Sequence, residues 1–497
     1  MKKILKNISL FVLIAVMLLA SAVTGALAAG PGEITVNKTV AGKTYDIYRI
    51  FDVTYTGTGA NKTYLYTMTD EFKGFFTSEY GIAADDHAGA VAIVSDSKKF
   101  DAFVEKVKKY ALENGIAVTD SKTATGTSVV FSNLSLGYYL VYPQGGLTAA
   151  CSLTTTDPEA TVDVKTEYPE IDKVIVENGT DKDVTTSKVG DKVTFKLTST
   201  VPDMTGYTKY TYKVTDTLSA GLTFNNDVAI KVGTRTLYSP QDFKVTPVAH
   251  AGNETIFEID FVDFLQHQAR AGDKVVITYT ATVNENAVIG GTGNPNEVNL
   301  IYSNNPKDEN STDKTPDDIV IVYTFMLNLE KVDAANHATK LNGAIFSLWT
   351  PEFISGATTK SHTDGGSSIV LYLIKNDLET TGNGTFQFNV KAGTYYLFEE
   401  TPPTGYNKMT DPIKFTVTPE FDPNTNLLLN VTTDNTDVTW DASTGSVSTT
   451  VENRSGLELP STGGRGVTLF VAGGGVLMLG SIGTLIFRRK KSPSRQK

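Results

Sequence analysis

The sequence is poor in cysteine, which limits how the folded protein can be stabilised. Cys151 is the only cysteine among 497 residues, so no disulfide can form within the chain. The stretch around it, residues 148–153, has the composition of a β-strand, and we expect a buried, unreactive thiol. Any extracellular role would therefore require another source of stability.

Histidine and the short motifs of common enzymes are also scarce. The five histidines lie far apart, without the spacing that a zinc site needs (His87, His250, His267, His337 and His362). The sequence contains no Gly-x-Ser-x-Gly nucleophile elbow and no phosphate-binding loop. We therefore predict that the protein is not an enzyme and uses no cofactor, and we assign no residue to a metal site.

Basic residues are outnumbered, with 44 Lys and Arg against 55 Asp and Glu and a formal net charge of −11. Ten of the basic residues lie in the terminal segments 1–28 and 463–497, which contain no Asp or Glu (Lys2, Lys3, Lys6, Arg465, Arg488, Arg489, Lys490, Lys491, Arg495 and Lys497). Without these segments the net charge is −21. Contact with phosphate needs clustered Lys and Arg, so we expect no binding to nucleic acid.

The N-terminal segment has the three parts of a secretory signal peptide. Three lysines precede an apolar stretch at 8–20, and Ala26-Leu27-Ala28 supplies the small residues of a cleavage site. We predict that residues 1–28 are removed on export, so the mature chain begins at about Ala29.

The C-terminal segment also has three consecutive parts. They are Leu459-Pro460-Ser461-Thr462-Gly463, an uncharged apolar run at 467–487, and a basic cluster at 488–491. The apolar run is long enough to span a hydrocarbon core of about 30 Å, and the basic cluster should stay cytoplasmic. This order resembles a sortase cell-wall sorting signal. The resemblance implies cleavage between Thr462 and Gly463 and transfer of the Thr462 carbonyl to an amine. An ordinary C-terminal membrane anchor is the alternative.

The composition of the mature chain predicts a mainly β protein. Short alternating runs of Val, Thr, Tyr and Phe are separated by Gly, Asn, Asp and Pro, which favours tandem immunoglobulin-like β-sandwich domains. Turn-rich stretches near 168–170 and 304–310 divide the chain into domains at 29–167, 168–323 and 324–456, followed by the sorting signal at 457–497. In the first domain, apolar residues between Phe100 and Ala111 recur at helical spacing and predict one inserted helix, whereas the other two domains should be all β.

Six polar residues lie in phase with apolar neighbours on predicted strands. Because side chains two apart share one face of a strand, each should point toward a core. They form two sets of one lysine, one acid and one asparagine: Lys173, Asp216 and Asn296 in the middle domain, and Lys331, Glu399 and Asn453 in the third. Lysines that extend to solvent and polar residues on edge strands are the alternative.

A lysine, an acid and an asparagine in one core suggest a specific reaction. An apolar setting lowers the pKa of a lysine, which favours the neutral, nucleophilic amine, and raises the pKa of a carboxylic acid. The protonated acid can then polarise the asparagine amide. Attack of the amine on the amide carbonyl would release ammonia and leave an isopeptide bond. The sequence therefore predicts autocatalytic crosslinks Lys173–Asn296 and Lys331–Asn453.

The third domain carries a family motif. Residues 396–406, Tyr-Leu-Phe-Glu-Glu-Thr-Pro-Pro-Thr-Gly-Tyr, resemble the E-box of sortase-assembled pilins and collagen-adhesin B-type domains. The resemblance puts the catalytic acid on Glu399, with Lys331 as the first-strand lysine and Asn453 as the last-strand asparagine. Glu400 stands where the family usually has Thr.

The middle domain resembles the collagen-adhesin A-type isopeptide domain at 216–222 and 294–302. The resemblance gives Asp216 the catalytic role, and Asn299 competes with Asn296 although it is out of phase with Val298 and Leu300. The first domain lacks the set, because Tyr142 stands where the acid would be and the last strand has only Asp163 as a possible partner.

These resemblances imply a backbone subunit (major pilin) of a Gram-positive, covalently polymerised pilus, exported and anchored to the cell wall. The implied partners are a sortase, neighbouring copies of the chain and peptidoglycan, with accessory pilins and host surface ligands as further candidates. In the family the acceptor lysine follows a Tyr-Pro pair; here Glu170 follows Tyr168-Pro169, and Lys165 is the best replacement. The alternative is a wall-anchored adhesin that binds a host ligand and never polymerises.

Overall fold

The computed structural model describes residues 32–456 except 58–61, 97–99, 145–148, 154–156, 165–167 and 249–253. The chain divides into two compact units. The first contains the described residues up to Val288 with Thr292–Thr324 and Pro423–Leu427, and the second contains Ile289–Gly291, Phe325–Asp422 and the described residues from Leu428. The prediction of a mainly β chain is confirmed.

Several predicted features lie outside the described residues: the signal peptide, the sorting signal with its apolar run at 467–487, and Lys165. Within the described ranges, no helix combines the length and the apolar character needed to cross a membrane.

The first unit begins with two small sheets. One has the strand order β5-β1-β8, and the other has the order β3-β2-β6-β7 with β4 also paired to β2. The strands are β1 Gly32–Asn37, β2 Thr44–Thr56, β3 Thr63–Met68, β4 Asp120–Thr123, β5 Ser128–Leu134, β6 Gly137–Pro143, β7 Ala149–Leu153 and β8 Glu159–Asp163. Cys151 therefore lies in a strand, as predicted.

Three helices pack beside the second of these sheets: α1 Asp70–Tyr80, α2 His87–Ser95 and α3 Phe100–Glu113. The predicted helix corresponds to α3, but the expectation of a single helix is wrong. In α1, Phe72, Phe75 and Phe76 recur at helical spacing and are buried, and Gly81 ends the helix with a φ of 67°. These side chains share one core with Tyr48 of β2 and Phe103 of α3.

The rest of the first unit is a β-sandwich, here called the middle sandwich. One seven-stranded sheet has the order β10-β9-β12-β19-β15-β16 with β14 on β19, and the other has β11-β22-β20-β13-β18-β17 with β21 on β20. The strands are β9 Asp172–Glu177, β10 Thr180–Lys182, β11 Val184–Thr186, β12 Lys192–Thr200, β13 Tyr212–Leu218, β14 Leu222–Phe224, β15 Ala229–Val232, β16 Arg235–Leu237, β17 Phe243–Val248, β18 Thr255–Phe261, β19 Lys274–Val283, β20 Asn294–Ser303, β21 Thr312–Lys314 and β22 Asp318–Tyr323.

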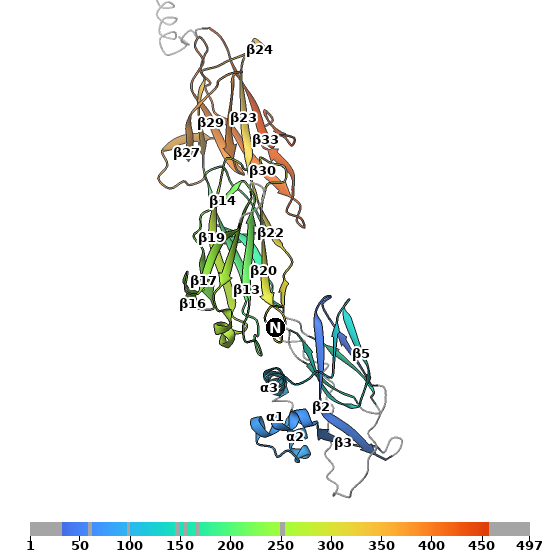
Figure 1. Ribbon diagram of the computed structural model, residues 1–497. Coiled ribbons are helices and arrows are strands. Elements are labelled where there is room, and N and C mark those ends of the chain that lie inside the picture. The colour runs from blue at the N-terminus through green and yellow to red at the C-terminus, as the bar shows by residue number, and fades with distance from the viewer. Residues whose placement is uncertain are drawn as a thin grey trace, which may run out of the picture. The chain divides into compact units, whose positions relative to one another are not determined.

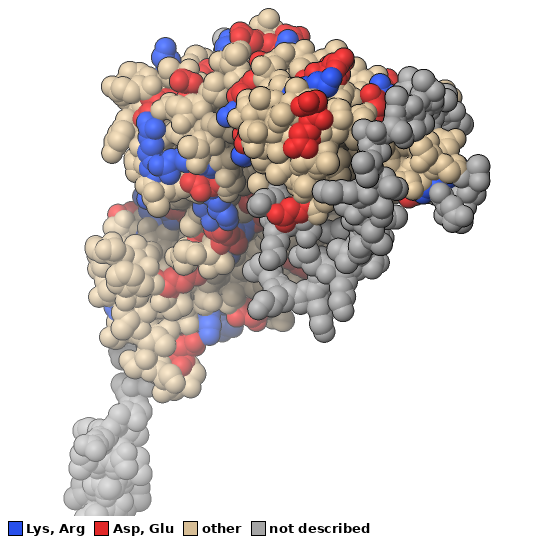
Figure 2. Space-filling view, turned by 90° about the horizontal axis from the view of Figure 1, so that it is seen from below, with Lys and Arg blue, Asp and Glu red and all other residues tan. Residues whose placement is uncertain are grey.

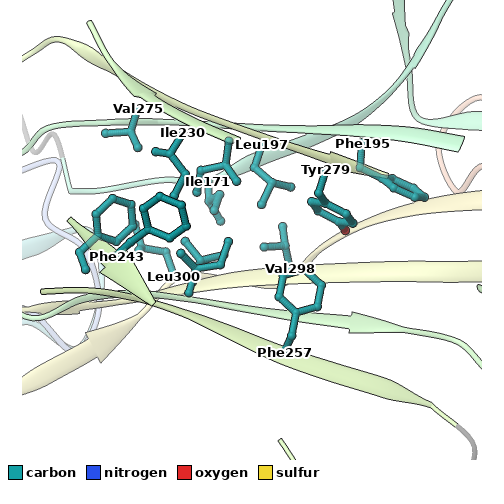
Figure 3. Close-up of a cluster of buried hydrophobic side chains, with 14 of the residues drawn as sticks. Ile171, Phe195, Leu197, Ile230, Phe243, Phe257, Val275, Tyr279, Val298 and Leu300 are labelled. Carbon is teal, nitrogen blue, oxygen red and sulfur yellow. The ribbon is translucent and has the colours of Figure 1, made fainter. Parts of the chain in front are cut away.

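The core of the middle sandwich comes from alternate residues of both sheets. Leu197 and Tyr279 from the first sheet face Phe257 and Leu300 from the second (Figure 3). The 3-10 helix η2 at Phe264–Arg270 departs from the all-β expectation, and its Phe264 joins the same core.

The second unit is another β-sandwich, here called the C-terminal sandwich. One sheet has the order β24-β23-β33-β32 with β28 on β23, and the other has β26-β27-β25-β29-β30-β31. The strands are β23 Phe325–Asp333, β24 Asn336–Lys340, β25 Ile345–Thr350, β26 Thr359–Asp364, β27 Ser367–Glu379, β28 Thr385–Val390, β29 Gly393–Thr401, β30 Ile413–Phe421, β31 Leu428–Thr433, β32 Val438–Asp441 and β33 Ser446–Asn453.

The first and last strands of the C-terminal sandwich, β23 and β33, are neighbours and run parallel (Figure 1). Their register pairs Lys331 with Val451 and Asp333 with Asn453. Alternate residues of β23 are buried, so Lys331 points to the same core as Leu327 and Leu329. The pairing therefore brings two residues that are far apart in sequence, Lys331 and Asn453, to one end of the sheet.

Charged side chains are mixed on the face shown in Figure 2. Asp and Glu are scattered among Lys and Arg there, with uncharged residues between them. The six candidate crosslink residues are all buried and contribute nothing to this surface: Lys173, Asp216, Asn296, Lys331, Glu399 and Asn453.

Candidate isopeptide sites

The site in the middle sandwich lies between its two sheets. Lys173 comes from β9 of one sheet, whereas Asp216 and Asn296 come from the paired strands β13 and β20 of the other. The Lys173 Nζ donates hydrogen bonds to Asp216 Oδ2 (2.8 Å) and to Asn296 Oδ1 (2.6 Å). The structure thus places the amine against both the acid and the amide carbonyl, as a crosslinking reaction requires.

The surroundings of this site favour neutral groups. Burial lowers the pKa of Lys173 to about 8, although the Asp216 carboxylate opposes the shift. Burial also raises the pKa of Asp216, and its Oδ1 is buried without a hydrogen-bond partner among the described residues. Both effects favour a neutral amine beside a protonated acid, which are the forms that the predicted reaction would use.

A fourth residue, Tyr279 on β19, belongs to this site and was not predicted. Its hydroxyl donates a hydrogen bond to Asp216 Oδ2 (2.8 Å) and accepts one from Asn296 Nδ2 (2.7 Å). In the sequence, Tyr279 alternates with Val275, Ile277 and Ala281 like any core residue of a strand. No local pattern reveals its role, because its partners lie on two strands of the facing sheet.

Asn299, the competitor of Asn296, makes different contacts. Its Nδ2 donates a hydrogen bond to Asp317 Oδ1 (3.0 Å), while Asn296 is the asparagine that contacts Lys173. The two side chains lie on opposite faces of β20, since their positions differ by an odd number of residues. The geometry therefore favours Asn296 as the crosslink partner.

The site in the C-terminal sandwich has another arrangement of the same three residue types. Lys331 and Asn453 lie on the neighbouring strands β23 and β33 of one sheet, and Glu399 projects from β29 of the other. Glu399 Oε1 lies 3.7 Å from Lys331 Nζ and accepts a hydrogen bond from Asn453 Nδ2 (2.8 Å). One carboxyl oxygen therefore contacts both the amine and the amide.

Further contacts fix the residues of the C-terminal site. The Met409 backbone N–H donates to Glu399 Oε2 (2.7 Å), and Lys331 Nζ donates to the Val451 carbonyl (3.2 Å). Burial lowers the pKa of Lys331 to about 8, with the Glu399 carboxylate opposing the shift. The setting thus favours the neutral amine, as in the middle sandwich.

The N-terminal part of the first unit lacks such a site among its described residues. Lys38 is exposed, with 69% of its side-chain surface accessible, and its Nζ lies 2.8 Å from Asp163 Oδ2. Tyr142 is buried in the core that contains the helices. An exposed ion pair provides no apolar setting that would favour the neutral forms of its partners.

Comparisons with known proteins cover most of the chain. The family model described as "Gram-positive pilin backbone subunit 2, Cna-B-like domain" matches residues 189–306. The "Prealbumin-like fold domain" model matches 325–436, and the "LPXTG cell wall anchor motif" matches 458–492. The description of the first model differs from the A-type resemblance expected for the middle domain.

A curated relative is the trypsin-resistant surface T6 protein of Streptococcus pyogenes serotype M6, which is 27% identical over an alignment of 403 residues. The match covers 66% of this chain and 70% of that protein. The T6 backbone pilin structure from serotype M6 has a TM-score of 0.50 at 18% identity and covers 86% of this chain and 99% of its own. The fimbrial protein FimP of Actinomyces oris has a TM-score of 0.52 at 15% identity and covers 88% and 99% of the two chains. The two solved structures show a shared fold.

Proposed function

We propose that this chain, a cell-wall-anchored backbone subunit of a Gram-positive sortase-assembled pilus, closes two internal isopeptide bonds, Lys173–Asn296 and Lys331–Asn453. The observation that carries the proposal is the burial of a lysine, an acid and an asparagine in one contact set, once in each sandwich: the lysine contacts both partners in the middle sandwich, and the acid contacts both in the C-terminal one. A buried ion pair alone would explain a lysine beside an acid, but not an asparagine in the same contact set at both places.

The proposed reaction is balanced without any further reactant. The neutral lysine Nζ attacks the asparagine Cγ, the Cγ–Nδ2 bond breaks, and the amide nitrogen leaves as ammonia. One proton lost from Nζ ends on the leaving nitrogen, and the acid carries protons between the two. Each chain reacts once with itself, so the chemistry is a self-modification and not catalytic turnover.

The crosslinks would supply the stability that disulfides cannot. Cys151 has no second cysteine to pair with, and each proposed bond closes a loop of about 120 residues. By analogy with a disulfide, closing a loop of this length stabilises the folded state by roughly 4–5 kcal/mol, because it restricts the unfolded chain.

The mature chain, residues 29–462, should weigh less than its sequence mass by two molecules of ammonia. Intact-mass spectrometry measures the loss, and peptide mapping should find Lys173 joined to Asn296 and Lys331 joined to Asn453. A mass equal to the sequence mass would refute both crosslinks, and the loss of a single ammonia would restrict the proposal to one sandwich.

Paired asparagine variants identify the partner in the middle sandwich. Asn296→Ala should reduce the loss to one ammonia molecule, since it removes the amide that contacts Lys173. Asn299→Ala, the matched control on the other face of β20, should leave both losses intact. The opposite pattern would transfer the crosslink to Asn299.

We further propose that polymerisation joins the Thr462 carbonyl of one subunit to Lys165 of the next. The support is the sorting signal together with the position of Lys165 just before Tyr168-Pro169, the pair beside which the resemblance to sortase-assembled pilins places an acceptor lysine. A sortase and neighbouring copies of the chain are then the direct partners, and accessory pilins and host surface ligands are additional candidates.

A further inference from the structure

Tyr279 holds a position between the acid and the leaving group of the middle sandwich. Its hydroxyl is the only link that the structure describes between the Asp216 carboxyl and the Asn296 Nδ2, at 2.8 Å from one and 2.7 Å from the other. Asp216 itself contacts the amine of Lys173 through the same Oδ2. A chain of contacts therefore runs from Lys173 Nζ through Asp216 and Tyr279 to Asn296 Nδ2.

Comparison with the C-terminal sandwich gives a reason for the Tyr279 hydroxyl in the middle sandwich. Glu399 Oε1 contacts Asn453 Nδ2 directly, at 2.8 Å, and also lies beside Lys331 Nζ. Asp216 is shorter than a glutamate by one methylene group. Where Glu399 contacts its asparagine nitrogen directly, Asp216 is linked to Asn296 Nδ2 through the Tyr279 hydroxyl. The pair of aspartate and tyrosine thus spans the distance that one glutamate spans in the other site.

The ring of Tyr279 is held firmly by its neighbours. It stacks on Phe195 with ring centroids 5.3 Å apart, and it meets Phe224 and Phe257 edge to face at 5.6 and 5.2 Å. Figure 3 shows Tyr279 beside Phe195 within the apolar cluster. This packing fixes the hydroxyl, because a ring fully enclosed in a core has few alternative positions.

We infer that Tyr279 is a catalytic residue of the Lys173–Asn296 reaction, in which its hydroxyl passes a proton from Asp216 to the leaving nitrogen of Asn296. The inference rests on the proposed function, since it assumes that the crosslink forms. It adds a residue that the lysine, acid and asparagine of the family pattern do not include.

The proton path follows from the change at the amide nitrogen. Before the reaction, Asn296 Nδ2 donates to Tyr279 and Tyr279 donates to Asp216. When Lys173 Nζ bonds to Cγ, the nitrogen Nδ2 loses its amide conjugation and becomes basic. Both hydrogen bonds then reverse: Asp216 takes a proton from Nζ and gives one to Tyr279, and Tyr279 gives its own proton to Nδ2.

Ammonia leaves when the Cγ–Nδ2 bond breaks, and Asp216 and Tyr279 end in their starting protonation states. Burial raises the pKa of Tyr279 well above its usual value, so the residue passes a proton without existing as a free phenolate. Atoms and protons balance within the site, and no outside acid or base takes part.

The test is the rate of crosslink formation in Tyr279→Phe, which keeps the ring and removes only the hydroxyl. We expect the Lys173–Asn296 bond to form about 100-fold more slowly or not at all, a loss typical of a missing proton-transfer group. Intact mass and peptide mapping of the mature chain over time after purification give the rate. The Lys331–Asn453 bond in the same molecule should form normally and serves as an internal control.

A matched control removes a buried hydroxyl elsewhere in the middle sandwich. Tyr212→Phe deletes a core hydroxyl that bonds to Ser199 and does not contact the site, so the crosslink should form at the unaltered rate. If Tyr212→Phe slows the reaction as much as Tyr279→Phe, general loosening of the core is the cause and the inference is overturned.

A rescue variant separates a proton path from a merely structural role. In Asp216→Glu combined with Tyr279→Phe, the longer acid should reach Asn296 Nδ2 directly, as Glu399 reaches Asn453, and crosslinking should recover by at least about tenfold. A double variant as slow as Tyr279→Phe, or a Tyr279→Phe variant as fast as the unaltered chain, would overturn the inference. Absence of the Lys173–Asn296 bond in the unaltered chain would instead refute the proposed function at this site, and the proton path with it.

Discussion

Glu399→Ala should abolish the Lys331–Asn453 bond and lower the melting temperature of the C-terminal sandwich by roughly 10–30 °C. The acid contacts both reacting groups through Oε1, so its removal leaves the amide without a group to polarise it. The lost loop closure corresponds to roughly 4–5 kcal/mol, which gives the expected shift for a domain of this size. Differential scanning calorimetry, intact mass and resistance to trypsin measure the three consequences.

The neighbouring acid provides the control for this prediction. Glu400 follows directly in sequence but contacts Ser347 and the surface lysine Lys360, outside the crosslink site. Glu400→Ala should keep the bond and change the melting temperature little, as expected for an exposed ion pair. An intact crosslink and unchanged melting in Glu399→Ala would remove Glu399 from the mechanism.

Lys165→Ala should reduce the high-molecular-weight ladder of pili to monomers in cells that supply the sortase. The substitution removes the proposed acceptor amine but leaves the sorting signal, so the monomer should still be attached to the wall. Thr462→Ala should remove both the ladder and the wall attachment, because no carbonyl is presented for transfer. Denaturing electrophoresis after wall digestion shows the ladder, and fractionation shows the attachment.

Lys182, an exposed lysine of the middle sandwich, supplies the control, and Lys182→Ala should leave the ladder unchanged. If the ladder persists in Lys165→Ala, sequencing of the linked peptides will identify the lysine that carries the Thr462 carbonyl. If the Thr462 carbonyl is found only on wall peptide, the protein does not polymerise and the adhesin alternative replaces the proposal.

Strand phase was a good guide to the candidate sites. Lys331, Glu399 and Asn453 each alternate with apolar residues, and the structure buries all three in one contact set. The period of two makes the buried face of a strand readable from sequence. It does not tell which strands meet, so the contact of Lys173 with Asn296 was expected from the chemistry of the three residue types and from the family resemblance.

The period of two along a strand also explains why the role of Tyr279 was not predicted, whereas helices α1 and α2 were missed for other reasons. Tyr279 has the phase of an ordinary core residue, and its significance depends on a hydroxyl that reaches two strands of the opposite sheet. Helix α1 did carry a local signal, since Phe72, Phe75 and Phe76 are spaced for one helical face and Gly81 follows. Helix α2 is almost uniformly apolar, and its sequence does not distinguish a buried helix from a buried strand.

The parallel pairing of β23 with β33 has a consequence for how the subunit withstands cleavage by a protease. Once Lys331 and Asn453 are joined, the chain between them is a closed ring, and the two residues that close the ring also carry the chain to the two ends of the subunit. A protease that cuts any one peptide bond within residues 332–452 opens the ring without separating the two ends of the subunit. A fibre built from such subunits would survive a first cut in any loop of this sandwich, so these loops could diversify in sequence, and be attacked, at no cost to the continuity of the polymer.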